Sequence, residues 1–227
     1  MTPSAPLTID LKGHGTVSAL LTTPGQPVAT YVFAHGAGAG MNHAFMQAVA
    51  TGLAIRNIAT LRYQFPYMER GSKRPDSPAI AHAAMRAAVA TAAAQCPGLP
   101  LIAGGKSFGG RMTSQAQAKQ PLPGVRGLCF FGFPLHPAGK PATERGDHLA
   151  AIAVPMLFLQ GTRDSLAEVK LIEPLVASLG PRATLHLVEN ADHSFHVPVK
   201  SGRNDSEIMD ELLDVMAAWV RRIVQRP

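Results

Sequence analysis

Short apolar runs alternate with longer amphipathic segments along most of the chain. Buried strands of a parallel sheet carry continuous apolar runs, whereas half-exposed strands alternate apolar and polar residues. The pattern therefore predicts an α/β fold, a mostly parallel, doubly wound sheet flanked by helices, with Thr16–Thr22 as an additional antiparallel strand at its edge. The predicted inner strands are Ala29–Ala34, Ile58–Tyr63, Leu101–Gly105, Gly127–Phe133, Met156–Gln160 and Thr184–Glu189.

Helix boundaries are indicated by capping residues and helix breakers. Ser77-Pro78 predicts the start of an alanine-rich helix that ends near Cys96-Pro97-Gly98. Ser165 and Glu168 have the spacing of a capping box, and the helix that they predict ends at Gly180-Pro181. The last helix carries apolar residues along one packing face: Ile208, Leu212, Val215, Trp219 and Ile223.

The segment Gly105-Lys106-Ser107-Phe108-Gly109 matches G-x-S-x-G between a predicted buried strand and a predicted helix. A serine on such a sharp turn is exposed above the sheet, and the flanking glycines admit neighbouring backbone. A phosphate-binding P-loop is the competing interpretation, but it would need glycine where Pro100 stands, and residues 101–104 read as strand. We therefore predict that Ser107 is a catalytic nucleophile.

An acid and a base each follow a later predicted strand, at the position where the strand ends. Asp164 comes just after Met156–Gln160, and His193 comes just after Thr184–Glu189. Histidine can take the serine proton near neutral pH, and an aspartate fixes its tautomer. His193 lies closer to its strand than its rival His196, and Asp192 is too near His193 in sequence to orient the ring. No further ligand cluster accompanies the two histidines, so we expect no metal site.

Small residues follow the first inner strand in the segment from His35 to Gly40. Such a turn leaves backbone N–H groups free, and we predict an oxyanion hole formed by the amides of Ala37 and Phe108. A dinucleotide fingerprint would need glycine where Met41 stands, and no acid follows the next strand. His35 is expected to be a structural brace rather than a base.

The composition is that of one globular domain, expected to span residues 1–227, with 46% hydrophobic residues. The formal charge is +6, but the basic residues are scattered, so we expect no nucleic-acid partner. Cys96 and Cys129 lack CxxC spacing and are expected to be buried free thiols. Neither a signal peptide nor an apolar run of about 20 residues is present, so we expect a cytoplasmic protein that does not enter the membrane. Nothing indicates the oligomeric state.

Several segments together resemble the α/β-hydrolase superfamily from Thr16 to the end of the chain. More narrowly they resemble a small, dienelactone-hydrolase-like branch that includes the testis-expressed-thirty protein and a subunit of the non-specific-lethal chromatin complex. The resemblance implies the α/β-hydrolase fold and a triad of Ser107, Asp164 and His193, but some members of this branch act as complex subunits. The matching segments are His35–Gly38, Arg62–Tyr67, Gly105–Arg111, Phe133–Pro141, Gln160–Asp164 and Asp192–Phe195.

The sequence says less about the substrate pocket and the class of substrate than about the catalytic residues. Phe65, Tyr67 and His136 follow strands, so they are candidates for pocket walls near the serine; loops held rigid by proline are the other interpretation, and both remain open. The connection Pro134–Leu149 is too short for a cap domain, which favours an open site for short acyl esters or accessible polyester ends.

The prediction is a serine esterase that uses an acyl-enzyme and no cofactor, acting on a small-molecule or polymeric ester. A thioesterase or amidase would use the same residues. A non-catalytic interaction protein on a hydrolase scaffold is the alternative from another class.

Overall fold

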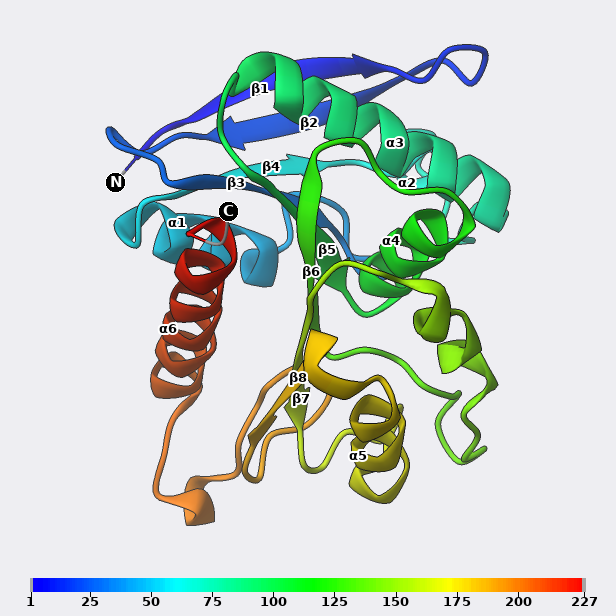
Figure 1. The fold of residues 1–227 in the computed structure, drawn as a ribbon, viewed down its shortest axis with the longest axis vertical. Helices are drawn as coiled ribbons and strands as arrows, with labels where there is room; N and C mark the ends of the chain where they lie inside the picture. Colours follow the sequence, from blue (N-terminus) through cyan, green and yellow to red (C-terminus); the bar gives the residue numbers. More distant parts are fainter. Residues whose placement is uncertain (1, 226–227) are drawn as a thin grey trace.

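Within residues 2–225, the part of the chain that the computed structural model describes, eight strands form one sheet in the order β1-β2-β4-β3-β5-β6-β7-β8 (Figure 1). Strands β3 to β8 are parallel, whereas β2 is antiparallel to both β1 and β4. The strands are β1 (Ser4–Asp10), β2 (Thr16–Thr22), β3 (Ala29–Ala34), β4 (Ile58–Tyr63), β5 (Leu101–Lys106), β6 (Val125–Phe131), β7 (Met156–Gly161) and β8 (Ala183–Val188).

All six predicted inner strands are present, and β6 and β8 begin and end one or two residues earlier than predicted. Thr16–Thr22 is antiparallel, as predicted, but it is not the edge of the sheet. The edge strand is β1, which pairs with β2 from Ser4 opposite Thr22 to Asp10 opposite Thr16. In β1 only Ile9 is buried, so this strand lacks the continuous apolar run of the inner strands.

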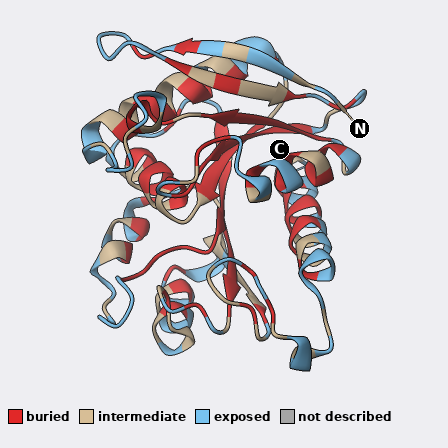
Figure 2. Ribbon diagram, turned by 180° about the vertical axis from the view of Figure 1, so that it is seen from behind, coloured by how far each residue is buried: buried red, intermediate tan, exposed pale blue. Residues whose placement is uncertain are grey.

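Helices cover both faces of the sheet (Figure 1). One buried cluster joins α1 and α6 to one face, and a second joins α3, α4, α5 and η1 to the other face. Figure 2 shows the buried strands between these half-exposed helices. The helical elements are α1 (Ala44–Ile55), α2 (Pro66–Glu69), α3 (Pro78–Gln95), α4 (Phe108–Lys119), η1 (Glu144–Ala151), α5 (Val169–Ser178), η2 (Gly180–Arg182), η3 (Val199–Ser201) and α6 (Asp205–Val224).

The helix boundaries agree with the sequence in part. Helix α3 begins at Pro78 with Ser77 at its N-cap position, although the Ser77 side chain makes no capping hydrogen bond. The capping box predicted at Ser165 is wrong, because α5 begins at Val169 with Glu168 at the N-cap position. Helix α6 has its own capping box, between Asn204 and Glu207. The predicted packing face of α6 is buried, apart from Val215, which is partly exposed.

Within residues 2–225, no element covers the carboxyl ends of the parallel strands as a cap. In the described residues, η1 is the only helical element between β6 and β7, and it packs beside α4 on the flank of the sheet. Cys96 and Cys129 are buried free thiols, as predicted. Residues 2–225 contain no helix that combines the length and the apolar character needed to cross a membrane.

Candidate active site

Ser107 occupies the turn between β5 and α4. Its backbone has φ 50° and ψ −116°, a strained conformation for a residue other than glycine. The turn fits only because its flanking residues have no side chain: a Cβ on Gly105 would lie 2.6 Å from the carbonyl oxygen of Ala34, and a Cβ on Gly109 would lie 2.5 Å from it. The strained turn therefore presents the Ser107 hydroxyl at the carboxyl end of the sheet.

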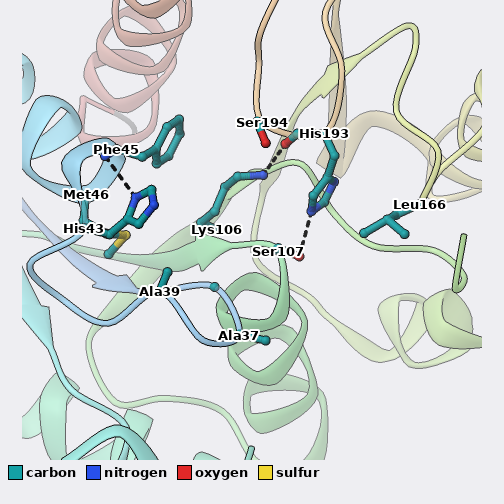
Figure 3. Close-up of a pocket in the computed structure, with 11 residues that line it drawn as sticks. Ala37, Ala39, His43, Phe45, Met46, Lys106, Ser107, Leu166, His193 and Ser194 are labelled. Atoms are coloured by element: carbon teal, nitrogen blue, oxygen red, sulfur yellow. Dashed lines mark hydrogen bonds between the residues drawn. The ribbon is translucent and has the colours of Figure 1, made fainter. Parts of the chain in front are cut away.

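The structure brings Ser107, His193 and Asp164 together, and Figure 3 shows the contact between His193 and Ser107. The His193 Nε2 lies 2.8 Å from the Ser107 Oγ, and the His193 Nδ1 lies 2.7 Å from the Asp164 Oδ2. Because a carboxylate accepts, Nδ1–H is the donor and the free Nε2 accepts from the serine hydroxyl. The contacts place the His193 Nε2 where it can accept the Ser107 proton.

The Asp164 carboxylate is fully buried and hydrogen-bonded on both oxygens. Besides His193, its Oδ2 accepts from the Gln160 Nε2 at 2.5 Å, and its Oδ1 accepts from the Leu166 N–H at 2.8 Å. Three donors compensate the carboxylate for its lost water, and they fix the direction in which it faces the ring.

The other residues weighed for the acid and base roles lie elsewhere. The His196 side chain is 65% exposed and its Nδ1 lies 2.8 Å from an oxygen of Asp205. One oxygen of Asp192 accepts the backbone N–H groups of Ser194 and His196 within its own loop. No group of three or more His, Cys, Asp or Glu side chains in residues 2–225 is arranged to hold a metal ion.

The two amides predicted as oxyanion donors lie beside the serine. Ala37 and Ser107 line the same cavity, and Phe108 is the first residue of α4. Among the described residues, neither the Ala37 N–H nor the Phe108 N–H donates a hydrogen bond to a protein acceptor. Both are therefore free to bind a substrate oxygen, and the positive end of α4 favours negative charge there.

His35 has the bracing position expected of it. Its ring is buried, with Nδ1 2.7 Å from the Gly36 carbonyl oxygen and Nε2 accepting from the Phe65 N–H at 3.1 Å. Burial lowers the pKa of His35 to about 4, so the ring is neutral near pH 7. A neutral ring with both nitrogens in use joins the loop after β3 to the segment after β4.

Phe65 and Tyr67 are not walls of the cavity at Ser107. Both are almost completely buried, and they hold the loop after β3 from behind. The Tyr67 hydroxyl accepts the Gly38 N–H at 3.0 Å, and both rings contact the ring of Phe108 edge-on. The interpretation as pocket walls is therefore wrong for these two residues, whose place is behind the candidate oxyanion amides.

His136 is also buried away from this cavity. Its backbone N–H donates to the Leu166 carbonyl at 2.9 Å, and its Nε2 lies 3.4 Å from the Glu168 N. The segment after β6 therefore supports the turn after Asp164 rather than contacting a ligand. Of the two interpretations of these proline-containing segments, the structure favours support.

The cavity at Ser107 has a volume of about 290 Å³. Its walls are mostly apolar, and Figure 3 shows the start of α1 on one side and the turn after Asp164 on the other. The walls include Ala39, His43, Phe45, Met46, Lys106 and Leu166. Four of them, His43, Phe45, Met46 and Leu166, carry no sequence signal because helix and turn residues outside a motif look like core.

The comparisons with known proteins agree with this architecture. Residues 27–221 match the model of the alpha/beta hydrolase domain family. The fold is similar to that of XC6422 from Xanthomonas campestris, described as a serine hydrolase without a lid, with 20% identity, 96% of each chain covered and a TM-score of 0.75. It is also similar to a dienelactone hydrolase from Anabaena variabilis, with 17% identity, 98% and 99% covered and a TM-score of 0.79.

An esterase domain from Rhodothermus marinus aligns with 19% identity over 97% of this chain and 99% of that one, with a TM-score of 0.74. At these identities the structural matches support the fold, whereas the family model rests on the sequence and covers most of the chain. Membership of this family supports hydrolase activity. The chain belongs to the alpha/beta hydrolase family.

Proposed function

We propose that this protein is a serine esterase that hydrolyses carboxylic esters through an acyl-enzyme. The observation that carries the proposal is the unbroken chain of contacts from the Ser107 hydroxyl through His193 to the buried Asp164. The segments that resemble the testis-expressed-thirty branch include all three residues. A scaffold with a purely binding role has no need of a base on a strained serine, so the contacts favour an enzyme.

In the proposed mechanism the Ser107 Oγ attacks the ester carbonyl carbon while its proton moves to the His193 Nε2. The carbonyl electron pair moves to oxygen, where the N–H groups of Ala37 and Phe108 stabilise the charge. Collapse of this intermediate breaks the bond to the alcohol, which leaves with the proton from His193.

A water molecule then attacks the acyl-enzyme, again giving its proton to His193, and the acid is released as Ser107 regains that proton. The buried Asp164 carboxylate orients the His193 ring through its contact with Nδ1, and it stabilises the imidazolium that forms in each half-reaction.

The cavity supports a short acyl group. A volume of about 290 Å³ with mostly apolar walls accommodates a short acyl group together with part of its alcohol, and within residues 2–225 no cap covers the entrance. We therefore propose short-chain esters or accessible ends of polyesters as substrates. Ester cleavage is preferred over amide cleavage because an alkoxide is a better leaving group than an amide anion, and because resonance stabilises the amide bond more than the ester bond.

Turnover of p-nitrophenyl butyrate by the wild-type protein and by Ser107→Ala tests the proposal. The wild type should turn over the ester, and Ser107→Ala should lose at least about 10³-fold in kcat. Ser165→Ala is the matched control, because Ser165 is exposed in the turn after Asp164 and should leave turnover unchanged. Turnover by Ser107→Ala at the wild-type rate would overturn the assignment.

A further inference from the structure

Lys106 precedes the candidate nucleophile, but its side chain belongs to the surroundings of the candidate base. The side chain is half-buried in the wall of the cavity, and the ammonium group donates a hydrogen bond to the backbone carbonyl oxygen of His193 (Figure 3). The ammonium also lies 5.7 Å from the ring centre of Phe45 and 5.2 Å from that of Phe195, within the range of cation–π attraction. One carbonyl and two rings therefore surround this cation.

The loop that carries His193 needs such an anchor because its backbone is strained. Phe195 has φ 66°, in the left-handed region where a bulky side chain is strained, and Asn190 has φ 62°, a conformation that asparagine tolerates. The Asp192 side chain binds amides of the same loop, so it shapes the loop without tying it to the sheet. In the described part of the chain, the bond from Lys106 is the only hydrogen bond to the backbone of His193.

Gly132, just after β6, leaves the space that the Lys106 side chain uses. A Cβ on Gly132 would lie 2.9 Å from the Lys106 Nζ and 3.4 Å from the His193 ring. Its φ of 66° is also one that glycine adopts without strain. A side chain at this position would therefore displace the Lys106 ammonium group and lie in contact with the His193 ring.

Burial lowers the pKa of Lys106 to about 8, although the carboxylates of Asp164 and Asp192 act in the opposite direction. The other titratable groups near it are the rings of His193 and of His43, which lines the same cavity. A charged group is retained here despite the cost of its burial. Proteins keep such a charge mainly where it has a function, despite the free energy of desolvating it. The function that this geometry offers the Lys106 ammonium is its hydrogen bond to the His193 carbonyl.

We propose that Lys106 is a positioning residue that holds the His193 loop against the turn of Ser107. Lys106 and Ser107 are adjacent in the chain. The same short piece of backbone therefore positions the Ser107 hydroxyl and, through the Lys106 side chain, the backbone carbonyl of His193, the residue that accepts the Ser107 proton. The separation of the Ser107 Oγ and the His193 Nε2 then depends on the bond from Lys106. This inference rests on the proposed function.

Lys106→Met tests it, because methionine keeps most of the apolar stem and removes the donor and the charge. The kcat for p-nitrophenyl butyrate should fall on the order of 10- to 100-fold with KM unchanged, since displacement by about 1 Å is enough for such a loss. The melting temperature should change by only a few degrees, because the lost hydrogen bond and the removal of a half-buried charge have opposite effects on stability. Lys119→Met is the matched control: Lys119 is an exposed lysine on α4, and its loss should leave kcat unchanged.

The pH profile separates positioning from simple packing. The wild-type kcat should decrease as the pH rises through about 8, because the neutral amine donates a weaker hydrogen bond than the ammonium. Lys106→Met should lack this decrease. If Lys106 acted only through packing, Lys106→Met would lower kcat but its pH profile would have the same shape as that of the wild type.

A wild-type kcat and pH profile in Lys106→Met would overturn the inference. So would a change confined to KM for a negatively charged ester such as a succinate half-ester, because that result assigns Lys106 to substrate binding. In either case an active wild type and an inactive Ser107→Ala would leave the proposed function intact. Turnover that does not depend on Ser107 would instead overturn the proposed function itself.

Discussion

Replacing Asp164 with asparagine should lower kcat by about four orders of magnitude while the fold is kept. The Asp164 Oδ1 accepts the Leu166 N–H, whereas its Oδ2 accepts from both His193 and Gln160. An asparagine that keeps its oxygen toward Leu166 points its NH₂ group at these two donors. The substitution thus removes one acceptor and creates two donor–donor contacts at the buried end of the site.

His193 can meet an NH₂ group only by accepting at Nδ1, which moves its proton to Nε2. In that tautomer Nε2 carries hydrogen toward Ser107 and cannot accept the serine proton. Gln160 cannot relieve the contact by turning its amide, because its Oε1 already accepts the Phe133 N–H at 2.9 Å. The same substitution in a serine-protease triad costs on the order of 10⁴-fold in kcat, or about 5.4 kcal/mol of activation free energy.

Steady-state turnover of p-nitrophenyl acetate, with thermal unfolding measured in parallel, checks this prediction. Asp205→Asn is the matched control, because Asp205 is exposed and pairs with His196 away from the cavity. Its kcat should stay within about twofold of wild type, as expected for the loss of an exposed ion pair. If Asp164→Asn keeps kcat within tenfold of wild type and remains folded, the tautomer argument is refuted.

Three further predictions concern the cavity and its supports. Across p-nitrophenyl esters, kcat/KM should peak between acetate and butyrate, and an optimum at palmitate would contradict an open, small site. Tyr67→Phe removes the acceptor for the Gly38 N–H and should lower kcat roughly 10-fold with little change in KM; an unchanged kcat would mean that other contacts suffice to hold the loop. Gly132→Ala should lower the free energy of unfolding by at least about 1–2 kcal/mol in urea titrations, because its φ is left-handed; equal stability would show that the strand end relaxes.

The inner sheet was predictable because buried parallel strands leave continuous apolar runs in the sequence. Strand β1 was not, since it lies at the edge and buries only Ile9. The boundary of α5 was missed for a local reason. Ser165 and Glu168 have capping spacing, but the Asp164 carboxylate takes the Leu166 N–H, so a turn forms before the helix begins.

The sequence was sufficient to predict those residues of the candidate site whose location depends only on where a strand ends. Ser107, Asp164 and His193 each follow a strand of the parallel sheet, so the topology alone gathers them at one edge. Position at that edge does not determine where a side chain points, which is why Phe65 and Tyr67 were assigned to the wrong side of the loop after β3.

The cavity walls and the proposed role of Lys106 could not be predicted from the sequence for a different reason. Phe45 and Met46 belong to the start of α1, and nothing in a helical apolar pattern distinguishes a cavity wall from core. Lys106 stands at a variable position of G-x-S-x-G. Its contact with the His193 carbonyl depends on how two loops far apart in the chain meet.

The most direct test of the central claim is covalent labelling of the folded protein with a fluorophosphonate, followed by intact mass and peptide mapping. Only a serine activated by a neighbouring base reacts readily. We predict a single adduct on the peptide that contains Ser107, and its absence in His193→Ala under the same conditions. An adduct on a different serine, or no adduct on folded wild-type protein, would contradict the account.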